Sequence, residues 1–288
     1  MSAWQPTRRR IGAALISMAV LALVVRFGLP AALHGFGLHP AFASSTHELR
    51  GRRALIVATN HGQLGDTGQA TGVASSELTA PYYEFLDAGM DVDLASIRGG
   101  RIPVDPQTLL WLIRAPADDR SLDDPVLQEK LARSRAVGEL DFASYDVVFL
   151  AGGWGAAYDL GFSDELGEQI TAANAAGKVI GGVCHGPLGL LRARARDGRP
   201  LVEGRRLTAV TDKQVRELGI EVTPQHPETE LRRAGAKFES STAFRDFLAN
   251  HVVVDGNLVT GQNQNAGTET AQRMMQLLVE QTTGETRT

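Results

Sequence analysis

Short, wholly apolar runs alternate with segments of helical periodicity along most of this chain. Strands that alternate with helices are joined by right-handed crossovers, which produce a mostly parallel sheet. The sequence therefore predicts an α/β domain. Its expected strands are 53–59, 92–95, 145–150, 179–183, 207–210, 252–255 and 258–260, and its expected helices are 76–88, 163–176, 187–196 and 268–281.

The first 45 residues differ from this pattern. Three arginines at positions 8–10 precede an uncharged run, 11–25, and Arg26 separates it from a second apolar stretch, 27–33. Fifteen residues are fewer than the roughly 20 that a spanning helix needs, but the long side chain of Arg26 can reach the interface and extend the span. We therefore expect residues 1–45 to form a membrane anchor and residues 46–288 to form the folded domain.

The arginines are expected to stay on the cytoplasmic side, so that the domain is exported. The alternative is a signal peptide cleaved at Ala41-Phe42-Ala43, which would leave a secreted or periplasmic domain. That motif lies far beyond the apolar run, which favours the anchor.

Charge and histidine positions argue against two classes of partner. Residues 1–50 hold five of the 29 basic and one of the 33 acidic side chains, so residues 51–288 carry 24 basic and 32 acidic ones. An acidic body argues against a nucleic-acid partner. The histidines are scattered, and one cysteine cannot form a multi-cysteine site, so we expect neither a metal nor another cofactor.

Cys184 is the single cysteine, and it follows the apolar run 179–183 directly. His185, Gly186 and Pro187 come next, which predicts a strand, a sharp turn and a helix N-terminus with a nucleophile at the bend. The helix dipole and the imidazole are expected to favour the reactive thiolate. The alternative is a buried structural cysteine, but such residues rarely need an adjacent histidine and a glycine elbow.

Three further elements follow expected strands and would meet Cys184 at the same sheet edge. Gly152-Gly153-Trp154 can present backbone N–H groups to a substrate oxygen, as an oxyanion site requires, or can be a simple turn. Glu77 at a helix start usually serves only the helix dipole or a cap. Asp212 can orient His185 in a Cys–His–acid arrangement or can be an exposed turn residue. The polar segment 105–140 is expected to form a flap or cap over this edge.

Several motifs resemble the ThiJ/PfpI superfamily. They are Gly152-Gly-Trp-Gly155 with Asp159-Leu, Val183-Cys-His-Gly-Pro187, and the run Val253-Val-Asp-Gly-Asn-Leu-Val-Thr-Gly-Gln-Asn263. The branch that contains stress-induced chaperones and glyoxalase III is similar in further runs: Glu77-Leu-Thr-Ala-Pro-Tyr-Tyr, Asp87-Ala-Gly, Leu94-Ala-Ser-Ile-Arg-Gly-Gly100 and Pro103-Val-Asp-Pro106. The resemblance covers about residues 54–278. It implies the class I glutamine amidotransferase-like fold, a three-layer, doubly wound sheet.

The resemblance also implies roles. Cys184 would be the nucleophile, His185 its partner, Glu77 the acid that contacts the thiol and relays protons, and Asp212 the third acid. The backbone of Gly153 and Trp154 would help to form the oxyanion site. Trp154 departs from the branch, which usually has histidine there, and an indole would reshape the pocket. Members of the family commonly form homodimers.

The function implied is a cofactor-independent glyoxalase III (D-lactate dehydratase), which converts methylglyoxal or another small 2-oxoaldehyde into a 2-hydroxy acid through a Cys184 hemithioacetal. One alternative is a cysteine hydrolase, such as a peptidase, amidase or protein deglycase. Another is a non-catalytic stress chaperone or thiol redox sensor, because accessible thiolates oxidise readily.

Overall fold

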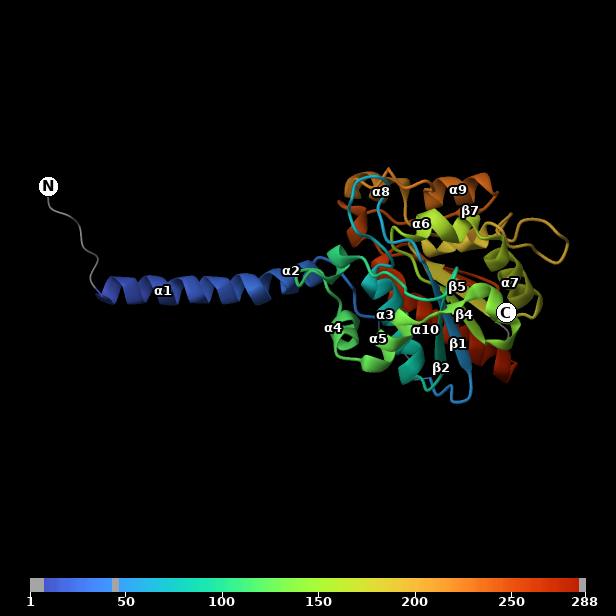
Figure 1. The fold of residues 1–288 in the computed structure, drawn as a ribbon, viewed down its shortest axis with the longest axis horizontal. Coiled ribbons are helices and arrows are strands. Elements are labelled where there is room, and N and C mark those ends of the chain that lie inside the picture. Colours follow the sequence, from blue (N-terminus) through green and yellow to red (C-terminus); the bar gives the residue numbers. More distant parts are fainter. Residues whose placement is uncertain (1–7, 43–46, 285–288) are drawn as a thin grey trace.

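The structure, a computed structural model, describes residues 8–42 and 47–284 and contains a seven-stranded sheet with helices around it (Figure 1). The strand order is β3-β2-β1-β4-β5-β9-β8, and only β8 runs antiparallel to its neighbour. The predicted α/β fold with a mostly parallel sheet is confirmed. The strands are β1 (Arg53–Ala58), β2 (Asp91–Ser96), β3 (Arg135–Ala136), β4 (Val147–Leu150), β5 (Val179–Val183), β8 (Val252–Asp255) and β9 (Leu258–Gly261).

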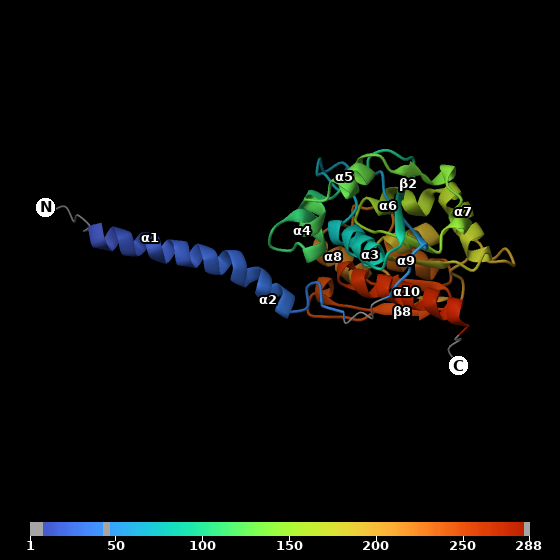
Figure 2. The ribbon, with the colours of Figure 1, turned by 90° about the horizontal axis from the view of Figure 1, so that it is seen from below.

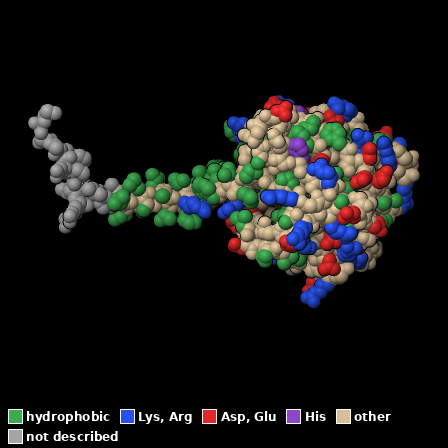
Figure 3. All heavy atoms as spheres, viewed as in Figure 1, with side chains coloured by type: hydrophobic (Ala, Val, Ile, Leu, Met, Phe, Trp, Pro, Cys, Tyr) green, Lys and Arg blue, Asp and Glu red, His purple; other side chains and the backbone are tan. Residues whose placement is uncertain are grey.

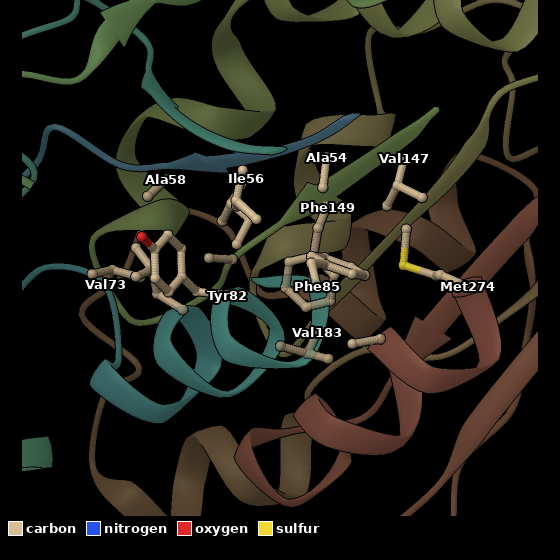
Figure 4. Packing of buried hydrophobic residues seen from close by; sticks show 14 of the residues in the cluster. Ala54, Ile56, Ala58, Val73, Tyr82, Phe85, Val147, Phe149, Val183 and Met274 are labelled. Carbon is tan, nitrogen blue, oxygen red and sulfur yellow. The ribbon is translucent and has the colours of Figure 1, made fainter. Parts of the chain in front are cut away.

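Helices cover both faces of this sheet, because the side chains of each strand alternate between two apolar clusters. In β1, Ile56 belongs to the cluster that contains Phe85 of helix α3 (Ser75–Asp87) and Met274 of helix α10 (Gly267–Thr283), as Figure 4 shows. The next residue, Val57, belongs to the opposite cluster with Ile170 of helix α7 (Asp164–Ala175). The result is the expected three-layer arrangement.

Five further helices of the body are short. They are α4 (Pro116–Leu122), α5 (Pro125–Ala132), α6 (Ala156–Asp159), α8 (Asp212–Leu218) and α9 (Pro227–Arg233). Segment 105–140, expected as a flap, contains α4, α5 and β3 and is fixed to the body. The Thr79 hydroxyl of α3 donates to buried Asp118 of α4 at 2.8 Å, and the Tyr83 hydroxyl donates to Asp124 at 3.0 Å. Its role as a cap stays a prediction.

The predicted helix at 187–196 is wrong. The segment forms a five-residue 3-10 helix, Gly186–Leu190, and the chain then folds back, with the N–H of Leu201 donating to the carbonyl of Ala193 at 2.9 Å. Close packing explains the short element. A Cβ on Gly186 would lie 2.1 Å from the Leu150 carbonyl oxygen, so the turn sits directly on the end of β4.

The strand predicted at 207–210 is also shorter than expected. Strand β6 (Arg206–Leu207) pairs with β7 (Lys237–Phe238) in a separate two-stranded parallel sheet. Beyond it the N–H of Thr208 donates to the Thr260 hydroxyl at 2.8 Å. The Thr260 side chain therefore accepts the hydrogen bond that the Thr208 N–H would donate to a neighbouring strand if β6 continued.

The N-terminal segment is a long helical rod that projects from the body (Figures 1 and 2). It comprises α1 (Arg8–Leu23), a π-helical turn (Val24–Gly28) and α2 (Leu29–Gly35). Its apolar window, Leu15–Gly35, has 21 residues, a mean hydropathy of 2.0 and no buried residues, and Figure 3 shows hydrophobic side chains around it. This length suffices to cross a membrane. The predicted boundary between residues 45 and 46 falls within 43–46, which lie outside the described residues. Ala43 of the alternative cleavage motif lies there too.

Candidate active site

Cys184 lies at the end of the fully buried strand β5, on a strained turn. Its φ is +58°, and His39 is the only other non-glycine residue of the described chain with a positive φ. The left-handed conformation costs an ordinary residue about 1–2 kcal/mol, so the surrounding structure must hold it. Backbone bonds do so: the N–H of Cys184 donates to Gly261 at 3.1 Å, and its carbonyl accepts from Val210 at 3.1 Å. The predicted sharp turn at the end of the strand is present, and the role of Cys184 as a nucleophile stays a prediction.

The carboxyl group of Glu77 lies in the same buried site, at the start of α3, with only 2% of the residue exposed. Burial raises the pKa of Glu77 to about 8, and the Cys184 side chain and the N–H groups of Gly153 and Gly152 act in the opposite direction. Oε2 is buried without a hydrogen-bond partner in the described parts of the chain. A carboxyl in this setting can hold or release a proton near neutral pH.

The thiol is also harder to ionise than usual. Burial, followed by the negative charge of Glu77, raises the pKa of Cys184 well above its ordinary value. The expectation that a helix dipole and an imidazole favour the thiolate was therefore wrong for the free protein. The helix behind the turn is too short to supply a strong dipole, and Cys184 and Glu77 compete for the same proton.

His185 follows directly and touches the sulfur: its Nδ1 lies 3.4 Å from Cys184 Sγ. Complete burial and, to a smaller extent, the charge of His226 lower the pKa of His185 to about 3. The imidazole is therefore neutral at physiological pH. Its Nε2 is buried and has no hydrogen-bond partner among the residues that the structure describes.

Asp212 begins helix α8 and binds helix α9. Its Oδ2 accepts a hydrogen bond from the Thr229 hydroxyl at 2.7 Å, and its N–H donates to Glu228 at 3.0 Å. Its other oxygen, Oδ1, is buried without a partner in the described ranges 8–42 and 47–284. The contacts that the structure gives to Asp212 connect two helices, and its action on His185 stays a prediction.

The loop Gly152-Gly153-Trp154 follows β4. It packs against Glu77 and against the residues that directly precede α3. A Cβ on Gly152 would lie 2.3 Å from Oε2 of Glu77, and one on Gly153, where φ is +90°, would lie 2.2 Å from the Ala74 nitrogen. Only glycine allows these approaches. The N–H groups of both glycines act on the Glu77 carboxyl, so the predicted oxyanion donors face the carboxyl that would handle the proton.

Four of the predicted site residues line one cavity of about 350 Å³, whereas Gly152, His185 and Asp212 are not among its lining residues. Sequence reasoning foresaw four of its lining residues: Glu77, Gly153, Trp154 and Cys184. Segment 105–140, which was expected to cover this edge, contributes three of the rest, but sequence reasoning named none of the rest individually as lining residues. They are Leu38, His39, Ala74, Ser76, Gln107, Thr108, Ile113, Gln214, Leu218, Phe247 and Gln264.

Two other features of the molecule do not contribute to this cavity. A separate cavity of about 420 Å³ lies between α3 and segment 101–132 and contains none of the predicted catalytic residues. Within the described residues, no group of three or more His, Cys, Asp and Glu side chains could hold a metal ion.

The chain is similar to known proteins in sequence and in fold. A glutathione-independent glyoxalase of Schizosaccharomyces pombe is 28% identical over 236 residues, which cover 77% of this chain and 93% of that protein. The crystal structure of Rapid Encystment Protein 24 kDa of Francisella tularensis matches with a TM-score of 0.73 and 28% identity, covering 79% of this chain and 99% of that one.

Glyoxalase III of Candida albicans has the same fold, with a TM-score of 0.72, 24% identity, and coverage of 78% of this chain and 97% of that one. The model of the DJ-1/PfpI family matches residues 69–277, which include the elbow cysteine, its histidine and the buried glutamate. The chain therefore belongs to the DJ-1/PfpI family.

Proposed function

We propose that this protein is a glutathione-independent glyoxalase of the glyoxalase III type, which converts methylglyoxal or a similar 2-oxoaldehyde into a 2-hydroxy acid. The observation that carries the proposal is the placement of Cys184 and Glu77 together in one buried cavity, with His185 against the sulfur. Relatives named glutathione-independent glyoxalases, which match over most of their own length, support the same activity.

The first step forms a carbon–sulfur bond. The Cys184 thiol gives its proton to ionised Glu77, and the sulfur adds to the aldehyde carbon C1 of the substrate. The aldehyde oxygen then takes a proton and becomes the hydroxyl of a hemithioacetal. Trp154 also lines the cavity, and its backbone N–H, which does not act on Glu77, is suited to stabilise the negative charge on that oxygen while it forms.

The second step moves hydrogen from C1 to C2 without an external oxidant. A base removes the proton from C1 while the C2 carbonyl oxygen is protonated, which gives an enediol. Return of a proton to C2 and loss of the C1 hydroxyl proton give a thioester. C1 is oxidised and C2 is reduced by the same two electrons. Water then cleaves the thioester and releases the 2-hydroxy acid and the thiol.

Glu77 is the residue best suited to move these protons. Its pKa of about 8 lies near the operating pH, where one group can both accept and return a proton efficiently. His185, with a pKa of about 3, is a weak base, and its Nε2 has no orienting partner within the described ranges. A cysteine hydrolase needs an oriented base, so the geometry supports the isomerisation better.

The test is formation of D-lactate from methylglyoxal by the full chain in detergent, without glutathione. We expect turnover by the wild type and none by C184A. General acid–base catalysis contributes about 10²–10⁴-fold, so E77Q should lose activity on that scale. Full activity of C184A would contradict the proposal. Release of an amine from amide or glycated substrates, without lactate from methylglyoxal, would favour the hydrolase instead.

We also propose that the N-terminal helix is an uncleaved membrane anchor and that the domain is exported. Leu38 is only 3% exposed, and the N–H of His39 donates to Asn265 at 2.9 Å. Cleavage after Ala43 would remove both residues from their packed positions. Mass spectrometry of protein from carbonate-washed membranes should therefore give the uncleaved mass, and a soluble, shortened domain would contradict the anchor. Homodimerisation stays a prediction, which analytical ultracentrifugation can test.

A further inference from the structure

The segment that follows the N-terminal helix is built into the body at the active-site cavity. Residues 36–40 are here called the strap, and two of them, Leu38 and His39, line the cavity that holds Cys184. Gly37, with a φ of +104°, ends the helix, and the N–H of Leu38 donates back to Leu33 at 3.0 Å. The strap therefore continues directly from the rod that would cross the membrane.

Specific hydrogen bonds hold the strap. The N–H of His39 donates to buried Asn265 at 2.9 Å, and that amide donates to the carbonyls of Phe247 and Ala249. Burial lowers the pKa of His39, so its imidazole is neutral, and its Nε2–H donates to the Ile113 carbonyl at 2.9 Å. A segment held by both backbone and side-chain bonds is part of the folded domain rather than a flexible tether.

A second segment, residues 107–113, forms the adjoining wall and touches the rod. Gln107, Thr108 and Ile113 line the cavity. Between them, Trp111 places its ring against the guanidinium of Arg26, 4.9 Å from the ring centroid. Tryptophan and arginine side chains are favoured at the membrane–water interface. The same short segment therefore contacts the proposed anchor on one side and the catalytic cavity on the other.

The cavity is larger and more apolar than methylglyoxal requires. Leu38, Ile113, Trp154, Leu218 and Phe247 contribute apolar side chains to a space of about 350 Å³. One water molecule occupies about 30 Å³ in the liquid, so a substrate with five non-hydrogen atoms fills only a small part of this space. Leu38 of the strap and Ile113 line the same cavity as Cys184 and Glu77.

We propose that the strap is a wall of the substrate pocket and that it selects 2-oxoaldehydes whose substituent is an apolar chain longer than methyl. The inference rests on the proposed glyoxalase function. Cys184 and Glu77 take the aldehyde end, and Leu38 and Ile113 take the chain. Each methylene group that the pocket buries increases kcat/KM about fourfold, by the usual hydrophobic contribution. Substrates of this class partition into a membrane surface, which is where the anchor would hold the pocket.

The test compares methylglyoxal with hexylglyoxal, using the full chain in one fixed detergent. We expect kcat/KM at least tenfold higher for hexylglyoxal, mainly through a lower KM. L38S and I113S, which alter the wall from two separate segments, should each reduce that preference about tenfold. F36S is the matched control, because Phe36 is 74% exposed and does not line the cavity, and its preference should equal that of the wild type.

A binding measurement separates failure of this inference from failure of the proposed function. C184A should bind D-2-hydroxyoctanoate at least tenfold more tightly than D-lactate, and L38S in the same background should lose that difference. Equal kcat/KM for the two substrates in the wild type, or equal binding of the two acids, would overturn the inference. Tighter binding of the longer acid without turnover of either aldehyde would overturn the proposed function. It would still support the inference that the strap forms a pocket wall for an apolar chain.

Discussion

The carboxyl group of Glu77 and the thiol of Cys184 occupy one buried cavity, and burial raises the pKa of both groups. The two side chains reach it from different layers, Glu77 from the start of α3 and Cys184 from the end of β5. In the proposed reaction the pair shares a proton: the ionised carboxyl takes the proton that the sulfur must lose before it attacks.

The activity should rise with pH towards a plateau. Glu77, with a pKa of about 8, is mostly protonated at pH 6 and cannot accept the thiol proton until it ionises. We expect kcat/KM for methylglyoxal to increase about tenfold per pH unit below the apparent pKa, and to level off above about pH 8. Alkylation of Cys184 by iodoacetamide should follow the same profile. A profile already flat from pH 5.5 would contradict the shared proton.

The same carboxyl should make stability depend on pH. Between pH 4.5 and about 8 the folded protein keeps a proton on Glu77 that the unfolded chain has released. The unfolded state therefore binds fewer protons, and the free energy of unfolding falls as pH rises through this range. E77Q lacks the effect. Its urea midpoint relative to the wild type should be higher at pH 8.5 than at pH 5, and a difference independent of pH would refute this.

Gly152 should be intolerant of a methyl group. G152A would place a Cβ 2.3 Å from Oε2 of Glu77 and 2.7 Å from the Val183 carbonyl, so the carboxyl must move away from the thiol. We expect at least a 10²-fold loss of kcat/KM and a destabilisation of about 1–3 kcal/mol. G177A is the control: its φ is +72° but a Cβ there meets nothing within 4 Å. It should lose about 1 kcal/mol and keep full activity.

The strained backbone at Cys184 predicts that glycine at this position gives a more stable protein than alanine does. Replacing alanine by glycine normally costs about 0.5–1 kcal/mol within regular structure. At position 184 the φ of +58° reverses this preference, because glycine adopts it without strain. C184G should therefore be about 1 kcal/mol more stable than C184A in thermal unfolding, with both variants inactive. The ordinary order, with C184A the more stable, would show that the turn is unstrained.

The role of Asp212 can be separated from its packing. If its unpartnered Oδ1 orients His185 during the reaction, D212N should lower kcat about tenfold or more and shift the pH profile. T229V removes the hydrogen bond from the Thr229 hydroxyl to Oδ2 and serves as the control for packing. It should lower Tm and leave the pH profile unchanged. Equal effects of both variants on kcat and pH would assign Asp212 a purely structural role.

Most of the fold was predictable because apolar runs and helix boundaries are local properties. Strand β5 begins where its apolar run begins, β1 begins one residue earlier, at Arg53, and α7 follows Ser163, whose hydroxyl accepts from Leu166 as a cap does. The predicted helix after Cys184 failed for a non-local reason. Gly186 rests on the carbonyl of Leu150 in the neighbouring strand, and no periodicity in the sequence reports that contact.

The sequence led to three residues that the structure places together, but it did not predict their electrostatics. The motifs led to Cys184, His185 and Glu77, whose cavity the structure describes, whereas the direction of the thiol pKa depends on burial that only the packed fold defines. The wall residues had no sequence signal. Leu38 and Ile113 meet at the cavity because the fold brings the strap back over the sheet edge, although each reads as an ordinary apolar residue.

If the domain is exported as proposed, the high pKa of Cys184 affects how long the enzyme stays active. Peroxides and disulfides attack thiolates far faster than thiols, and extracellular compartments contain no large pool of reductant. Cys184 is 5% exposed and its raised pKa favours the protonated form, so it should react slowly with oxidants. The catalytic sulfur would thus be protected from inactivation between turnovers, at the expense of needing Glu77 to activate it each time.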